Sequence, residues 1–137
     1  MNYKQVMEKA KTLIEKFDVR TPSPETFARA LSGGNQQKAI IAREVDRSPD
    51  LLMAAQPTRG LDVGAIEFIH EQLVIEREKG RAVLLISFEL EEILQVSDRI
   101  AVLYEGKTVA FLDPKETNEI ELGFLMAGGK KEEVGHS

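Results

Sequence analysis

The stretch LSGGNQQK, residues 31–38, places a hydroxyl and two glycines at the point where a helical pattern begins. The apolar residues that follow recur at helical spacing, which predicts a helix over residues 35–47. The hydroxyl of Ser32 lies at this start, and Gly33 and Gly34 let a ligand approach the backbone. Unpaired amides and the positive end of the helix dipole suit an anion such as a phosphate. By this chemistry alone, a glycine-rich turn that merely caps a helix is the more common interpretation.

Upstream of this stretch, the sequence predicts an amphipathic helix and a proline-rich connector. Apolar residues recur at helical spacing over residues 3–17, with lysine and glutamate between them. Residues 21–24 read Thr-Pro-Ser-Pro, and each proline holds the preceding residue in an extended conformation and lacks an amide donor. The connector therefore separates the first helix from the one that begins at the glycine pair.

Downstream, short apolar runs alternate with helical patterns. Residues 51–55 and 82–87 are apolar runs bounded by turn residues, which predicts strands buried on both faces. Helices are predicted over residues 62–79 and 89–95. The order strand, helix, strand, helix implies that the two strands pair in parallel.

The end of the sequence predicts a β-hairpin, a helix and a polar tail. Two strand patterns, residues 100–104 and 108–112, flank a short turn that contains glycine. Residues 116–126 form a predicted helix, and residues 128–137 a mobile tail. The predicted fold class is therefore α/β, with a mostly parallel sheet that ends in a β-hairpin.

Composition and charge exclude several classes of function. The 137 residues are 42% hydrophobic and can bury a core. A net charge of −5, without a block of lysine and arginine, argues against a nucleic-acid surface. The chain has no cysteine, and His70 and His136 are too far apart to suggest a shared metal site. No apolar run approaches the ~18 residues that cross a bilayer, and no signal peptide is recognisable, so we expect a cytoplasmic protein.

Residues 31–38 resemble the signature motif of ABC-transporter ATPases, and the Asn-Gln-Gln variant resembles the ATPase subunits of importers for simple sugars and nucleosides. Further motifs follow in the family's order: PDLLM at residues 49–53, QPTRGLDVGA at 56–65 and SDRIAV at 97–102. The resemblance covers about residues 30–128 and looks most like the second, degenerate ATPase half of such a subunit. It implies part of a RecA-like nucleotide-binding core and part of the helical subdomain.

The resemblance implies a division of the chain and a set of partners. Residues 1–48 would belong to the helical subdomain, residues 49–127 to the C-terminal part of the core, and residues 128–137 to a flexible tail. The expected partners are another ABC ATPase half and transmembrane permease subunits, with no nucleic acid. The permease would hold the protein at the inner face of the cell membrane.

In this family, the signature motif closes over ATP bound by the opposite half of a head-to-tail dimer. The resemblance therefore implies that Ser32, Gly33, Gly34 and Gln36 contact ATP in trans. Asp62 would be the D-loop residue that reaches across the same interface. ATP and Mg²⁺ are expected in the full assembly, and neither is expected on the isolated chain.

Positions that would serve the chain's own nucleotide depart from the family's pattern. No phosphate loop of the form glycine, four residues, Gly-Lys-Ser/Thr is present. Ala55 and Gln56 replace an Asp-Glu pair that positions magnesium and assists the attacking water. Phe88 stands where a histidine contacts the γ-phosphate, and its ring cannot donate a hydrogen bond. The resemblance thus implies a degenerate site, and we expect no ATP hydrolysis by this chain alone.

Several other residues have structural interpretations. Gly106-Lys107-Thr108 matches the end of a phosphate loop, but Ala101 holds the required glycine position and the segment is a predicted hairpin turn. Lys38 and Arg43 are expected to solvate a helix face, and His70 is expected to be an ordinary helix residue.

The part of the core that the resemblance covers lacks the central strands of the sheet, and this affects how the chain associates. A parallel sheet without its central strands exposes unpaired amides and apolar side chains, so we expect a rearranged fold or self-association unless helices close the gap. The alternative function is a non-catalytic interaction module that binds a transporter partner without ATP. A related DNA-repair or chromosome-segregation ATPase is disfavoured by the acidic charge and the Asn-Gln-Gln variant.

Overall fold

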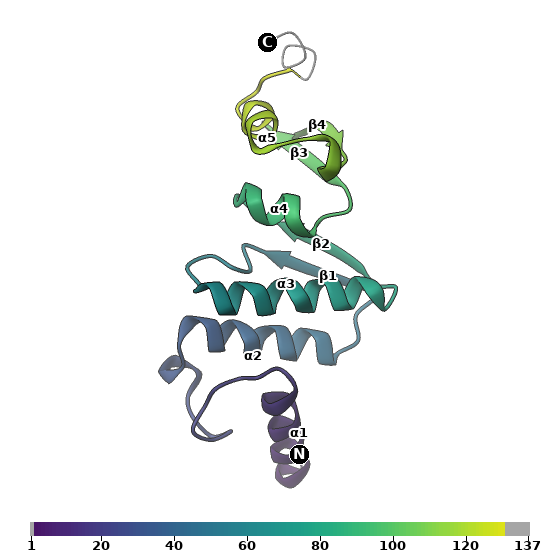
Figure 1. Ribbon diagram of the computed structural model, residues 1–137. Coiled ribbons are helices and arrows are strands. Elements are labelled where there is room, and N and C mark those ends of the chain that lie inside the picture. The colour runs from purple at the N-terminus through teal and green to yellow at the C-terminus, as the bar shows by residue number, and fades with distance from the viewer. Residues whose placement is uncertain (1, 131–137) are drawn as a thin grey trace. The chain divides into compact units, whose positions relative to one another are not determined.

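Helices predominate at the start of the chain and alternate with strands over residues 51–104, within residues 2–130, which are the residues that the computed structural model describes (Figure 1). In chain order the elements are α1 (Tyr3–Lys16), the 3₁₀ helix η1 (Ala28–Ala30), α2 (Gly33–Asp46), β1 (Leu51–Ala55), α3 (Val63–Glu78), β2 (Ala82–Ile86), α4 (Leu90–Val96), β3 (Ile100–Tyr104), β4 (Lys107–Leu112), the 3₁₀ helix η2 (Pro114–Glu116) and α5 (Glu119–Met126). They form two units, of which the first ends at Leu84 and the second begins at Leu85. The predicted division at residue 48 stays a prediction.

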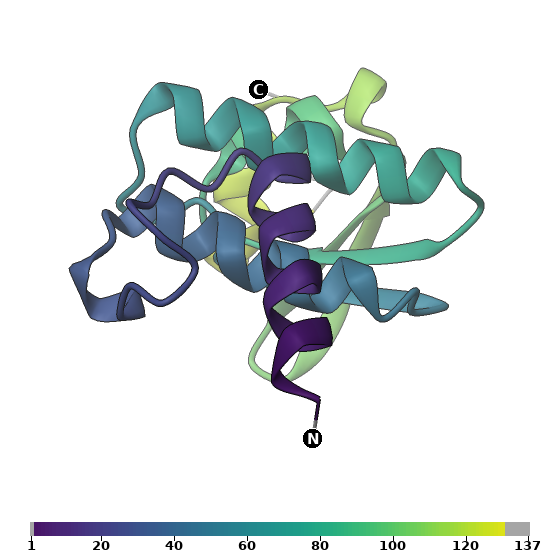
Figure 2. The same ribbon diagram turned by 90° about the horizontal axis from the view of Figure 1, so that it is seen from below.

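Helix packing dominates the first unit. Helices α2 and α3 run side by side, and α1 packs against α2, as Figure 2 shows. The predicted helix at the amino terminus is confirmed as α1, and the predicted second and third helices are confirmed as α2 and α3. The buried apolar residues of this unit are Phe17, Val19, Ile41, Ala42, Val45, Leu52, Ala54, Ala65, Ile69 and Leu73.

Strands β1 and β2 form a two-stranded parallel sheet, which confirms the predicted strands and their pairing. The prediction that both strands are buried on both faces is wrong. Leu51 and Met53 are 51% and 62% exposed, whereas Leu52 and Ala54 between them are buried. Successive side chains of a strand point to opposite faces, and only one face of β1 is covered by residues that the structure describes. In β2, Leu84 is 45% exposed.

The second unit contains the predicted hairpin. Strands β3 and β4 pair antiparallel, with a β-bulge between Val102 and Leu103. The turn residues Glu105 and Gly106 both have positive φ, 47° and 77°, as a type I′ turn requires. The triplet that begins at Gly106 therefore belongs to a hairpin, and its structural interpretation is confirmed.

Helices α4 and α5 complete the core of the second unit. Its buried residues are Ile100, Val102, Leu112, Leu122 and Leu125. The prediction that the last helix begins at residue 116 is wrong, because Pro114 starts the separate turn η2 and Asn118 caps α5 by accepting a bond from Glu121 N (2.9 Å). The predicted mobile tail lies outside the described residues from residue 131 onward. No helix within residues 2–130 has the length and apolar character needed to cross a membrane.

Two residues of α5, one buried and one exposed, give a matched test of the packing of this core. Leu122 is 1% exposed and Ile120 is 83% exposed. We expect Leu122→Ala to lower the free energy of unfolding by about 2–5 kcal/mol, because it leaves a cavity in a packed core. Ile120→Ala should change it by less than about 0.5 kcal/mol. Urea denaturation of both variants measures the difference, and equal effects would contradict this packing.

Candidate functional site

The glycine pair of residues 31–38 forms the first turn of α2, with Ser32 as its N-cap. Ser32 Oγ accepts hydrogen bonds from Asn35 N (3.3 Å) and from Asn35 Nδ2 (2.9 Å). Helix α2 begins at Gly33, two residues before the predicted start, because a serine cap brings both glycines into the first turn. The side chain of Ser32 and the backbone of Gly33 are exposed, so this turn can reach a ligand.

Three consecutive amide side chains fix the start of α2 to three other segments. The bonds run from Arg20 N to Asn35 Oδ1 (2.9 Å), from Gln36 Nε2 to Leu31 O (3.0 Å) and from Gln37 Nε2 to Pro57 O (2.6 Å). No structural role was predicted for Asn35 or Gln37. The one sign of such a role in the sequence is the side-chain amide of each residue, which can donate and accept hydrogen bonds at once.

The loop after β1 leads to the second predicted site residue. Pro57 and Thr58 of this loop are buried, although a loop residue is usually exposed. Asp62 caps α3, and its Oδ1 accepts a hydrogen bond from Ala65 N (2.8 Å). Because Gln37 holds Pro57, the structure brings the Ser32 turn and the Asp62 turn into one packed region of the first unit.

Gly34 marks the close approach of α2 to α3. A Cβ atom placed on Gly34 would lie 3.0 Å from Ala65 Cβ, which is closer than side chains normally pack. A Cβ atom on Gly33 would lie 3.7 Å from Leu61 Cδ2, which is an ordinary contact. Gly34 is therefore needed for helix packing, whereas space permits a side chain at Gly33.

This difference gives a matched pair of substitutions. We expect Gly34→Ala to lower the free energy of unfolding by about 1–3 kcal/mol, because it overpacks the contact with Ala65. Gly33→Ala should raise it by about 0.4–1 kcal/mol, because alanine restricts the unfolded chain. Thermal denaturation of both variants measures which of the two is the less stable. A more destabilising effect at Gly33 than at Gly34 would contradict the packing of the two helices.

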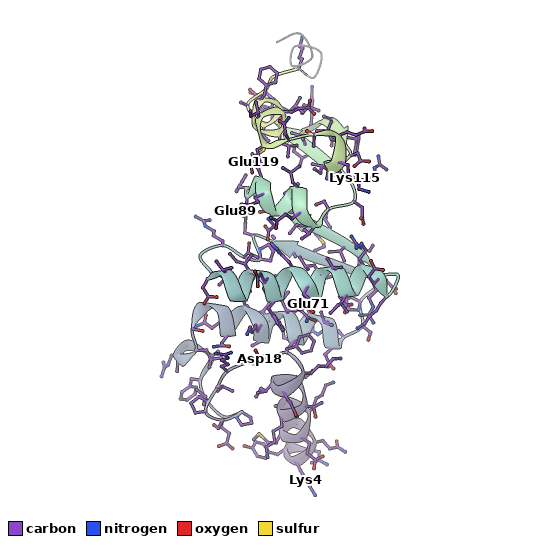
Figure 3. The ribbon with its side chains drawn as sticks, in the orientation of Figure 1. Lys4, Asp18, Glu71, Glu89, Lys115 and Glu119 are labelled. Atoms are coloured by element: carbon purple, nitrogen blue, oxygen red, sulfur yellow. The ribbon has the colours of Figure 1, made fainter. Side chains whose placement is uncertain are left out.

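The prediction that Lys38 solvates a helix face is wrong. Its side chain is 11% exposed, and Nζ donates to Asp18 O (3.1 Å) and lies 3.5 Å from Asp18 Oδ2. Nζ also lies 4.8 Å from the centre of the Phe68 ring, a distance typical of a cation–π contact. Asp18, labelled in Figure 3, follows α1, so Lys38 joins the end of α1 to α3. Arg43 is exposed, as predicted.

Of the three positions that depart from the family's pattern, Ala55 and Gln56 belong to the first unit and Phe88 to the second. Ala55 ends β1 and is exposed, and Gln56 has a φ of 49°, in the left-handed region that few non-glycine residues adopt. Phe88 lies in the second unit and is 74% exposed. Within residues 2–130, no group of three or more histidine, cysteine or carboxylate side chains could hold a metal ion.

Sequence comparisons place this chain beside import ATP-binding proteins. It is 64% identical over 131 residues to the guanosine import ATP-binding protein NupO of Bacillus subtilis, covering 96% of this chain and 26% of the relative. The nucleoside import ATP-binding protein NupA of Lactococcus lactis is 57% identical, over 94% of this chain and 26% of the relative. The ribose import ATP-binding protein RbsA of Bacillus subtilis is 40% identical, over 95% and 26%. The chain thus spans about a quarter of the length of these relatives. No family model matches the chain.

Solved structures agree on the fold. The dimeric bacterial ABC transporter cassette MJ0796 superimposes with a TM-score of 0.71 at 24% identity, over 85% of this chain and 50% of the cassette. The same values hold for its post-hydrolysis state bound to ADP and Pi. At this identity the likeness shows the fold alone. Over the residues that align, this chain is similar to the ATP-binding proteins of sugar and nucleoside importers, and its fold is that of the ABC ATPase cassette.

Proposed function

We propose that this chain is part of the ATP-binding subunit of an ABC importer for nucleosides or simple sugars. In this role Ser32, Gly33 and Gly34 bind the γ-phosphate of ATP that another ATPase half holds, and Gln36 lies at the same contact. Asp62 acts from the neighbouring turn at the same interface. The names of the relatives support the class of importer, and nucleoside import has the higher identities.

The packing of the Ser32 turn beside the Asp62 turn carries this proposal. Both turns begin a helix, and the amides of a first helical turn have no partner within the helix. The Gln37 bond to Pro57 holds the two turns in one arrangement. An anion gains from the amides, the Ser32 hydroxyl and the helix dipole together. Bound MgATP would supply the phosphate group and the metal charge that this chain does not carry.

The chain's own nucleotide site is part of the proposal. Ala55 offers no oxygen to a hydrated magnesium ion, and Gln56 cannot accept a proton from water. A general base is typically worth ~10²- to 10⁴-fold in rate. We therefore propose that the chain acts in trans on its partner's ATP and does not turn over ATP of its own. The permease would hold the assembly at the cytoplasmic face of the membrane.

Turnover by a competent partner tests the trans role. The partner is an importer ATPase half with an intact phosphate loop and catalytic carboxylate, and its ATP hydrolysis is measured with and without this chain. We expect the chain to raise turnover by roughly 100-fold, because preorganised donors at a reacting phosphate have effects of that size. An unchanged rate in a complex that gel filtration shows to be formed would contradict the trans role.

Calorimetry tests the degenerate site. Titration of MgATP into the isolated chain is expected to give no binding heat, because no phosphate loop cradles the nucleotide. The same titration into the competent half serves as the positive control. Stoichiometric micromolar binding by the isolated chain would show a nucleotide site that this proposal lacks.

One observation favours the alternative of a non-catalytic interaction module. Leu51, Met53 and Leu84 expose apolar surface on the sheet of β1 and β2. Such a face favours association with another chain or with a second copy. If the chain forms the complex and raises no turnover, this alternative replaces the trans role.

A further inference from the structure

The hydroxyl oxygen of Ser32 accepts two hydrogen bonds, both from Asn35. A serine hydroxyl carries one proton to donate and two lone pairs that accept. Asn35 uses the accepting side twice, through its backbone N (3.3 Å) and its side-chain Nδ2 (2.9 Å). Asn35 therefore leaves only the donor capacity of the Ser32 hydroxyl, its proton, for another partner.

The orientation of the Asn35 amide follows from a backbone donor. Arg20 N can only donate, so the Asn35 atom 2.9 Å from it must be the oxygen Oδ1. Nδ2 then faces Ser32 Oγ, and since Nδ2 can only donate, Oγ must accept. The Arg20 amide thereby determines which way the Ser32 hydroxyl can point its proton.

The segment that carries this donor is itself held in place. Phe17 and Val19 are 1% and 7% exposed, and Val19 N donates to Ile14 O (2.9 Å). The buried side chain of Lys38 also binds Asp18 of this segment. Arg20 N is therefore a fixed donor, and the amide orientation that it imposes is well determined.

We infer that Asn35 is a positioning residue that holds the Ser32 hydroxyl as a donor toward phosphate oxygens. This inference rests on the proposed binding of a γ-phosphate by Ser32. Oxygens of a phosphate accept hydrogen bonds, so a hydroxyl that points its proton away would present a lone pair and repel them. Asn35 excludes that orientation because it occupies the accepting side of Oγ.

Replacement of Asn35 by aspartate separates positioning from structural support. Aspartate keeps an oxygen for Arg20 N, and an acidic residue in a first helical turn is compatible with the helix dipole. Its second oxygen can only accept, so the Ser32 hydroxyl would turn its proton inward. We expect Asn35→Asp to lower turnover of the competent-half complex by roughly 10- to 100-fold, the size of a lost bond to a charged group. Asn35→Ala, which lets the hydroxyl rotate, should lose less.

The order of these two variants decides the role of Asn35. If Asn35 only supported the Arg20 segment, Asn35→Ala would be the more damaging and Asn35→Asp would be nearly neutral. Asn118→Asp is the matched control, because Asn118 caps α5 by the same kind of bond and lies outside the site. It adds the same charge and should change turnover by less than about twofold. Circular dichroism and hydrogen exchange of the Val19 amide, which donates to Ile14 O, confirm that each variant is folded.

A double-mutant cycle separates hydroxyl orientation from charge repulsion. In a Ser32→Ala background, Asn35→Asp should lower turnover by less than about twofold further, because no hydroxyl remains to be oriented. Full additivity, or wild-type turnover of Asn35→Asp, would overturn the inference. If Ser32→Ala impairs turnover and Asn35→Asp does not, only the positioning role fails. If Ser32→Ala itself is at the wild-type level, the proposed phosphate contact fails and the inference with it.

Discussion

Ser32→Arg is expected to abolish ATP turnover in the complex of this chain with a competent ATPase half. The long side chain would fill the space before the first turn of α2, where the γ-phosphate is proposed to bind. It would also remove the donor hydroxyl, so we expect a loss of roughly 100-fold or more. The chain should remain folded, because Ser32 is exposed and the loss of an N-cap costs about 1 kcal/mol. Steady-state ATP hydrolysis measures the effect.

Asn118→Arg controls for this substitution. Asn118 caps α5, so the control also removes an N-cap and adds a guanidinium group. It should leave turnover within about twofold of the wild type, since α5 begins in the second unit and carries no proposed ligand contact. Wild-type turnover in the Ser32→Arg complex, at full binding of the chain, would eliminate the trans role.

Arg81→Met is expected to cause the largest loss of stability in the first unit. Glu76 is fully buried, and its carboxylate pairs with Arg81 and with Lys79 Nζ (3.2 Å). Methionine keeps the apolar stem of the arginine and removes its charge, which leaves a buried carboxylate with one partner. Breaking a buried ion pair in this way costs about 3–5 kcal/mol. Urea denaturation with an unchanged m-value would measure the loss.

Two comparisons make this prediction specific to the buried pair. Arg43→Met removes an exposed arginine that pairs with Glu44, and it should cost less than about 1 kcal/mol. The double variant Glu76→Leu with Arg81→Met removes both charges and should recover most of the stability that Arg81→Met loses. Equal losses for Arg43→Met and Arg81→Met would show that burial of Glu76 has no energetic consequence.

Local patterns in the sequence predicted most of the secondary structure. The helix that follows the glycine pair was predicted to start within two residues of its observed start, because hydrophobic spacing and glycine punctuation are local signals. The hairpin was predicted from the turn that contains Gly106, which adopts the positive φ that glycine favours. The start of α5 was missed because the turn at Pro114 resembles a first helical turn in sequence.

Features that depend on distant partners could not be predicted from local patterns. Lys38 looked like a surface lysine, but its burial depends on Asp18 and Phe68, which lie 20 and 30 positions away in the sequence. The bond from Gln37 to Pro57 also spans 20 positions. The apolar run of β1 suggested burial on both faces, but composition alone does not show what covers each face. The candidate site was found by its motif, whereas its supports were visible only in the structure.

The two sheets differ in how far apart their strands lie along the chain, and this affects the order of folding. The two-residue turn between β3 and β4 closes a short loop, which costs little chain entropy and forms in microseconds. The parallel pair of β1 and β2 must wait for the whole of α3 to form between its strands. We therefore expect the hairpin to be the early kinetic event and the parallel pair to be the slow one. Until that pair forms, the Asp62 turn depends on the packing of α3 against α2 and on the bond from Gln37 to Pro57.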